Sequence, residues 1–338
     1  MRGETMLETI HASLQTVAQL EAAIRGGEPL FLAGSRDALQ RLPRGNWVAG
    51  TIPYFMTDDG GLLSEDRVFA TPVPACAVSV KPAVYGASDL AALYREAPLH
   101  GFTFLVLPAA TEVHKTFAER ASSFDGFLLK PMVGWVTGVR VDRIGAERPA
   151  VIDGMTGELF EDRCAALHLA LPANKIADLD IVNIFDRGDG PTIRFDDAGF
   201  KVRECLIDGG WANLASYVTR HGIPTEFPLV GDYNGSAINV SFQKVDAQAG
   251  TVDFYAPVFP GVNYHFAKPV ADYEKAFAEA IGNDSQEPEF ACNCILNYLY
   301  GKLEGKKTGH VTGPITFGEV AHQLLNQTMV RLYLRDIG

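Results

Sequence analysis

The chain has 338 residues, of which 47% are hydrophobic and 21% are charged. This length exceeds that of a usual single domain and the apolar content can fill a sizeable core, so we expect an ordered protein of two domains. The net charge is −12 at pH 7, and no run of lysines and arginines occurs. An acidic surface repels phosphate backbones and anionic lipids, which argues against nucleic acid and membranes as partners.

Several features of the sequence favour a cytoplasmic location. No segment reaches the roughly 20 apolar residues that a membrane-spanning helix needs. Residues 1–10 carry two glutamates and lack the hydrophobic stretch of a signal peptide. The cysteines are odd in number and scattered, which fits reduced thiols in a cytosol; they are Cys76, Cys164, Cys205, Cys292 and Cys294.

In the first half of the chain, helical and extended patterns alternate. A capping box formed by Thr5 and Glu8, followed by apolar residues at helical spacing, predicts a first helix that ends at Gly26 and Gly27. Gly134 indicates a bend or a close backbone approach within an extended segment. Strands are expected at 30–33, 47–52, 68–80, 102–107, 130–141, 151–152 and 164–171, and helices at 88–96 and 111–121.

The second half begins where the chain turns polar, at residues 172–178, which predicts domains of residues 1–175 and 176–338. A helix is expected to start at Pro269. Strands are expected at 181–185, 191–195, 200–206, 238–245 and 251–257. Because helices interrupt hairpins in both halves, we predict an α+β or α/β fold, with two mixed domains of antiparallel-rich sheets covered by helices.

Familiar catalytic signatures are absent from the sequence. It contains no Walker phosphate loop, no well-placed G-x-G-x-x-G, no H-E-x-x-H and no G-x-S-x-G. The histidines are unclustered, and their spacing to the cysteines matches no known zinc site. We therefore predict neither a metal nor a cofactor.

The segment Cys292-Asn293-Cys294 reads as a strand that runs into a helix, because apolar residues follow it at helical spacing. Asn293 would cap this helix, and Cys294 would lie in its first turn, where the dipole favours a thiolate. Four roles stay open for the cysteines: a ligand-contacting thiol, a redox pair, a nucleophile, or two small buried hydrophobes.

Glu319 is the one acid in an apolar stretch and permits two interpretations. If it lines a cleft, it can hold an ammonium or guanidinium group, with Gly318 allowing close backbone approach. Asn326 and Thr328 would then point the same way from a strand and share a ligand. Alternatively, Glu319 begins a helix that Asn326 ends.

The C-terminal block resembles the FIST family, named for F-box and intracellular signal transduction proteins. Residues 313–320 (GPITFGEV) look like its aromatic-Gly-Glu signature, and 325–328 (LNQT) like the Asn-x-Thr that closes its C-terminal domain. Residues 48–51 and 131–138 are similar to its glycine-marked strands. Two features depart from the family: Ile295 replaces an arginine three places after Cys292, and a glycine pair appears as Gly-Trp at 134–135.

The resemblance implies a FIST N-like domain at 1–175, a FIST C-like domain at 176–338 and a role as a ligand sensor, with amino acids among the small molecules proposed for the family. We therefore expect a stand-alone sensory or small-ligand-binding protein rather than an enzyme. Its pocket, in or beside the C-terminal domain, would be lined by Cys292, Asn293, Cys294, Gly318, Glu319, Asn326 and Thr328.

Alternatives remain open at this point. One is a cysteine-dependent enzyme that uses Cys294 or Cys292, and another is a haem-binding sensor, since some FIST members carry haem, although no histidine here matches a haem ligand. A third is an interaction module with an acidic surface. A protein signalling partner and a homo-oligomer are compatible with each of these.

Overall fold

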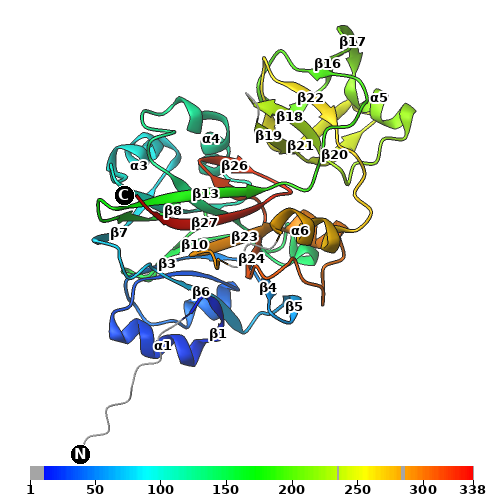
Figure 1. Cartoon of the computed structure of the whole chain (residues 1–338). Helices are drawn as coiled ribbons and strands as arrows, with labels where there is room; N and C mark the ends of the chain where they lie inside the picture. The colour runs from blue at the N-terminus through cyan, green and yellow to red at the C-terminus, as the bar shows by residue number, and fades with distance from the viewer. Residues whose placement is uncertain (1–10, 234–235, 283–285, 338) are drawn as a thin grey trace, which may run out of the picture.

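Two six-stranded sheets face each other at the centre of the molecule, and helices cover their outer faces (Figure 1). The computed structural model describes residues 11–233, 236–282 and 286–337. Between the sheets, Phe31 stacks on Phe104 with ring centroids 4.3 Å apart. Phe290 packs against both of these rings, and Trp135 packs against Phe31 and Phe290. The mixed α/β fold predicted from the sequence is confirmed.

The first sheet has the order β1-β6-β2-β3-β10-β11, with β2 and β3 parallel. Its strands are β1 (Ser13–Thr16), β6 (Arg67–Pro72), β2 (Leu30–Gly34), β3 (Trp47–Thr51), β10 (Val151–Asp153) and β11 (Glu158–Phe160). Leu20 and Ile24 from α1 (Val17–Gly26) and Leu39 from α2 (Arg36–Gln40) are buried against its outer face. The alternation of buried residues between its two faces follows from the strand period of two.

The second sheet has the order β26-β25-β9-β8-β12-β7, with β8 and β9 parallel. Its strands are β26 (Gln323–Leu325), β25 (Glu319–Ala321), β9 (Met132–Thr137), β8 (Gly101–Pro108), β12 (Cys164–Ala170) and β7 (Ser79–Tyr85). Its outer face packs on α3 (Leu90–Glu96) and α4 (Glu112–Arg120). Short 3-10 turns span η1 (Ala87–Asp89), η2 (Ala121–Ser123) and η3 (Val141–Arg143).

A third sheet crosses the front of this sandwich in Figure 1, in the order β13-β27-β23-β24-β4-β5. Its strands are β13 (Lys175–Val182), β27 (Met329–Asp336), β23 (Phe290–Cys294), β24 (Gly313–Thr316), β4 (Tyr54–Thr57) and β5 (Gly60–Leu63). Two helices accompany it, α6 (Tyr273–Ile281) and α7 (Ile295–Tyr300).

The remaining segment, residues 183–268, forms a small β unit with its own core and stands apart from the sandwich in Figure 1. Its strands are β14 (Ile193–Arg194), β15 (Gly199–Val202), β16 (Glu204–Ile207), β17 (Gly210–Asn213), β18 (Leu229–Tyr233), β19 (Ser236–Val240), β20 (Phe242–Asp246), β21 (Thr251–Val258) and β22 (Asn263–Phe266). One helix, α5 (Leu214–His221), packs on it.

The sheets combine distant parts of the chain. In the second sheet β9 pairs with β25, and in the third β4 pairs with β24. A cut after residue 175 would therefore separate strands that hydrogen-bond to each other. The segment that is separate in space is the small β unit, inserted between β13 and α6.

The predicted first helix is wrong at residues 13–16. Thr5 and Glu8 lie outside the described residues, and Ser13–Thr16 pair antiparallel with β6 instead of continuing a helix. The helix starts at Val17, after a capping box between Thr16 and Gln19. Its predicted end is correct, because Gly27 adopts φ +86° there. Among the described residues, no helix has the length and apolar character to cross a membrane.

Gly134 allows β9 to lie close to β8. We therefore predict that a side chain at this position destabilises the protein. Its φ is +153°, and a Cβ atom there would lie 1.9 Å from the carbonyl oxygen of Leu105. We expect Gly134→Ala to lower the free energy of unfolding by at least about 3 kcal/mol, since backbone must move in a buried sheet. Urea unfolding followed by circular dichroism measures this.

Gly145→Ala is the matched control, because Gly145 also has positive φ (+89°) but open space around it. Only the conformational cost of about 1 kcal/mol applies there. Equal losses in the two variants would contradict the steric explanation for Gly134.

Candidate functional site

A group of buried polar side chains lies where the end of β23, the strand β25 and the turn between β26 and β27 come together. Each is at most 4% exposed, although polar residues of these types are normally found at the surface. We call this group the polar core cluster; it consists of Asn293, Asn297, Thr316, Glu319, Asn326 and Thr328.

The junction between β23 and α7 positions the first two members. The predicted passage from strand to helix is correct, but the cap residue is Cys294 rather than Asn293. The Asn293 Oδ1 atom accepts hydrogen bonds from the backbone N–H of Cys294 at 2.7 Å and from Nδ2 of Asn297 at 3.0 Å. Asn297 was missed from the sequence, yet its spacing of four residues from Asn293 is the helical contact spacing.

Glu319 lies on β25, which pairs with β9 on one side and with β26 on the other. The alternative prediction of a helix from Glu319 is therefore wrong: the chain reverses at His322, whose φ is +58°. One carboxyl oxygen, Oε2, accepts hydrogen bonds from the Thr328 backbone N–H at 3.2 Å and from its hydroxyl at 2.8 Å. The structure thus brings Glu319 and Thr328 into direct contact.

Burial raises the pKa of Glu319 to about 8, although interactions with Thr328 and, more weakly, with the Cys294 and Thr316 side chains act in the opposite direction. Desolvation dominates because the charged form loses its water shell in a site of low dielectric constant. The carboxyl group therefore keeps its proton at neutral pH and can donate as well as accept a hydrogen bond.

Asn326 and Thr328 do not share a strand face, contrary to the prediction. Both precede β27, and Gln327 between them has a φ of +51°. The Asn326 Oδ1 atom instead accepts hydrogen bonds from the backbone N–H and the hydroxyl of Ser241, at 2.9 and 2.6 Å. Ser241 belongs to the small β unit, so this contact ties that unit to the cluster.

Gly318 is buried beside the cluster and contributes its backbone. Its carbonyl oxygen accepts hydrogen bonds from the Thr316 hydroxyl at 3.1 Å and from the N–H of Val136 at 2.8 Å. Its φ of +153° is a conformation that glycine adopts most easily. The expected close approach is thus a contact between strands.

Four polar atoms of the cluster have no hydrogen-bond partner within the described part of the chain. They are two amide donors and two oxygens, namely Asn293 Nδ2, Asn326 Nδ2, Asn297 Oδ1 and Glu319 Oε1. Folded proteins pair nearly all such atoms, since each one left unpaired costs about 1–3 kcal/mol. The cluster therefore has unused capacity for a polar guest, whether water or a ligand.

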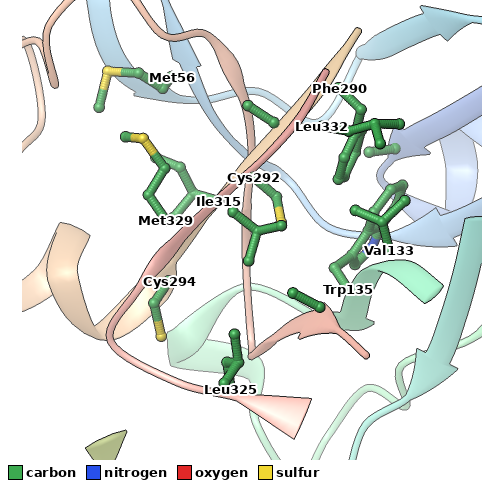
Figure 2. Packing of buried hydrophobic residues seen from close by; sticks show 14 of the residues in the cluster. Met56, Val133, Trp135, Phe290, Cys292, Cys294, Ile315, Leu325, Met329 and Leu332 are labelled. Atoms are coloured by element: carbon green, nitrogen blue, oxygen red, sulfur yellow. The ribbon is translucent and has the colours of Figure 1, made fainter. Parts of the chain in front are cut away.

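The two late cysteines are buried free thiols in the main apolar core. Figure 2 shows Cys292 on the side of Ile315 and Trp135, with Cys294 farther along the strand in the direction of Leu325. The Cys292 thiol donates to the carbonyl oxygen of Gly134 at 3.4 Å. Burial and then the nearby Glu319 raise the pKa of both thiols well above the usual value.

This environment opposes the thiolate that the helix dipole alone would favour. Burial outweighs the dipole because α7 has only six residues and Cys294 is 1% exposed. Within the described ranges, no three His, Cys, Asp or Glu side chains gather in a way that could hold a metal ion.

The pKa of Glu319 leads to a pH prediction. The folded state holds the proton up to about pH 8, whereas the unfolded chain loses it near the ordinary value of 4.5. The contribution of Glu319 to the free energy of unfolding thus falls as pH rises through this window, by about 1.4 kcal/mol per pH unit. Glu319→Gln should remove this slope and be relatively more stable at pH 9 than at pH 5.

Urea unfolding at pH 5, 7 and 9 tests this, with Glu21→Gln as the control. Glu21 is a surface partner of Arg25 on α1, with 46% of its side chain exposed. Its substitution should leave the slope as in the unsubstituted protein. Parallel stability curves for Glu319→Gln and the unsubstituted protein would refute the raised pKa.

The thiol environments predict low reactivity. In the native protein at pH 7, iodoacetamide should modify Cys292 and Cys294 only as fast as the chain opens, because buried thiols with raised pKa are poor nucleophiles. The half-buried Cys76 should react first. Peptide mass spectrometry over time measures the rates, and fast labelling of Cys294 would favour the cysteine-dependent enzyme.

A family model matches residues 15–335 of this sequence, and it is described as a family of unknown function, DUF6976. No curated protein matches the sequence. Since the match extends over nearly the whole chain, this protein belongs to the DUF6976 family.

Proposed function

We propose that this is a stand-alone small-ligand-binding protein, sensory in the way that the FIST resemblance implies, whose binding site is the polar core cluster. The observation that carries the proposal is that four buried polar atoms of this cluster have no hydrogen-bond partner within the described residues. A core that served packing alone would gain stability from apolar residues there. We also propose a cytoplasmic location, where the five free cysteines stay reduced.

The chemistry of the unpaired atoms defines the class of ligand. The amide groups of Asn293 and Asn326 offer donors, and Asn297 Oδ1 offers an acceptor. Glu319 offers a carboxyl group that is protonated and neutral when no ligand is bound. It becomes anionic if a bound cation displaces its proton. A small molecule with an ammonium group and a polar or carboxylate end, such as an amino acid, complements this set.

Access to the cluster would come from the boundary between the small β unit and the sandwich. Hydrogen bonds across this boundary include that of Ser241 with Asn326, that of the Asn239 amide with the carbonyl of Gln327 at 3.1 Å, and that of the Gln327 amide with the carbonyl of Glu226 at 2.9 Å. A hollow between the two parts is lined by both Asn239 and Leu324. Ligand sites commonly lie at boundaries of this kind.

Two tyrosines, Tyr255 and Tyr300, lie near enough to Cys294 to interact with it electrostatically. Burial raises the pKa of Tyr255 and Tyr300, and the nearby Cys294 contributes a smaller part of the increase. Tyr300 is 39% exposed, and Tyr255 comes from the small β unit. Tyrosine rings at such a position would attract the ammonium end of a ligand through their negative faces.

Thermal unfolding against a panel of amino acids and small amines tests the proposal. A ligand present at about 100 times its dissociation constant should stabilise the protein by about 2.7 kcal/mol. Glu319→Gln should abolish the stabilisation by an ammonium ligand, because it removes the charge that the ammonium requires. Binding should strengthen from pH 6 to 8 and release a proton, which calorimetry in two buffers detects.

Glu289→Gln is the matched control, since burial also raises the pKa of Glu289, on the segment before β23 and outside the cluster. It should bind as the unsubstituted protein does. The proposal fails if no compound shifts the unfolding and Glu319→Gln and Asn326→Ala leave any copurified small molecule, seen by native mass spectrometry, unchanged.

A further inference from the structure

A second hollow lies where parallel strands of the first and second sheets end. Its walls include Ser35 after β2, Thr51 at the end of β3, and Gly138 after β9. The N–H of Gly138 donates to the carbonyl oxygen of Thr51 at 2.7 Å, which joins the ends of the two sheets. Ligands of α/β proteins commonly bind outside the carboxyl ends of such strands.

Three arginines line this hollow, Arg36, Arg140 and Arg148. One carboxylate contacts two of these arginines. Glu161 accepts a hydrogen bond from Arg36 Nη2 at 2.6 Å and another from Arg148 Nη1 at 3.4 Å. These hydrogen bonds, that from Arg36 first, lower the pKa of Glu161, so it stays ionised. Glu161 is thus a positioning residue for two guanidinium groups.

The same two guanidinium groups keep unused donors. Within the described residues, Nε and Nη1 of Arg36 and Nε and Nη2 of Arg148 make no hydrogen bond to the protein. About a third of the Arg36 side chain and 81% of the Arg148 side chain are exposed. Arg140, by contrast, is occupied by Glu65 and Asp142.

We propose that this arginine cleft binds the oxyanion group, a carboxylate or a phosphate, of a small metabolite through Arg36 and Arg148. Paired guanidinium donors match the geometry of oxyanions better than any other side chain. The cleft is small, with a cavity volume of about 30 Å³, so it has room for an oxyanion group and not for a polymer. Two glutamates, Glu65 and Glu147, also line the cleft. They are paired with Arg140 and Arg143, which leaves Arg36 and Arg148 as the charges available to an anion.

Calorimetric titrations with inorganic phosphate and with succinate test the cleft at low ionic strength. We expect saturable binding of one of them, which identifies the class of oxyanion, and weaker binding as sodium chloride is added. Arg36→Gln and Arg148→Gln should each weaken the affinity by about tenfold or more, because each removes a charged donor. Arg148 is exposed, so its substitution leaves folding intact even if Arg36→Gln does not.

Arg335→Gln is the control, since Arg335 also pairs with a carboxylate, Asp178, and 44% of its side chain is exposed, but it lies on β27 outside the cleft. It should bind the anion as the unsubstituted protein does. The proposal is overturned if neither anion binds saturably, or if the affinity is the same in Arg148→Gln and in Arg335→Gln. Glu319→Gln should leave this binding unchanged, which separates the cleft from the polar core cluster.

Discussion

The desolvation of the Glu319 carboxyl group is the constraint on which the arrangement of the site depends. A fully buried acid must keep its proton or find donors, and the two hydrogen bonds from Thr328 reach only one of its oxygens. Those bonds fix the turn before β27 against β25, and β25 lies between β26 and β9 in the second sheet. One buried side chain thus joins the second sheet to the start of β27 in the third sheet.

The polar contacts around this acid also specify how the small β unit sits. Ser241 uses both its backbone N–H and its hydroxyl on the same oxygen of Asn326, and its hydroxyl also contacts the amide oxygen of Gln327. Apolar packing between two bodies tolerates sliding, whereas hydrogen bonds of this kind exist only in one register. These polar bonds therefore help to define the position of the unit, together with the apolar contacts that Val230, Ile238 and Ala256 make with the two larger cores.

The local patterns in the sequence predict much of the fold, but not the contacts that build the site. Strands such as β8 and β12 and the hairpin of β20 and β21 follow from runs and alternation of apolar residues. The pairing of β9 with β25 joins segments far apart in the chain, so it cannot be predicted from local sequence patterns. Ser13–Thr16 carry a helical pattern but pair with β6, an example of tertiary context overriding periodicity.

The candidate residues show the same division. Glu319 and the late cysteines can be selected from the sequence by residue type alone. Ser241 cannot, because its partner Asn326 is 85 residues away. The chemistry of Cys294 depends on a competition that the sequence leaves undecided: a helix start favours the thiolate, and burial beside Glu319 disfavours it more strongly.

The two proposed sites differ in the physics of ligand entry. The arginine cleft faces solvent and presents charges, so an anion would reach it by steered diffusion, with rates that fall as salt screens the attraction. The polar core cluster is at most 4% exposed and neutral when empty, so a ligand would have to wait until the contacts between Ser241 and Asn326 open. Because binding to such a site is linked to an opening equilibrium, its apparent affinity is the intrinsic affinity reduced by the fraction of molecules that are open. A ligand that holds Asn326 and Glu319 would therefore also change the position of the small β unit, which is the coupling that a sensor requires.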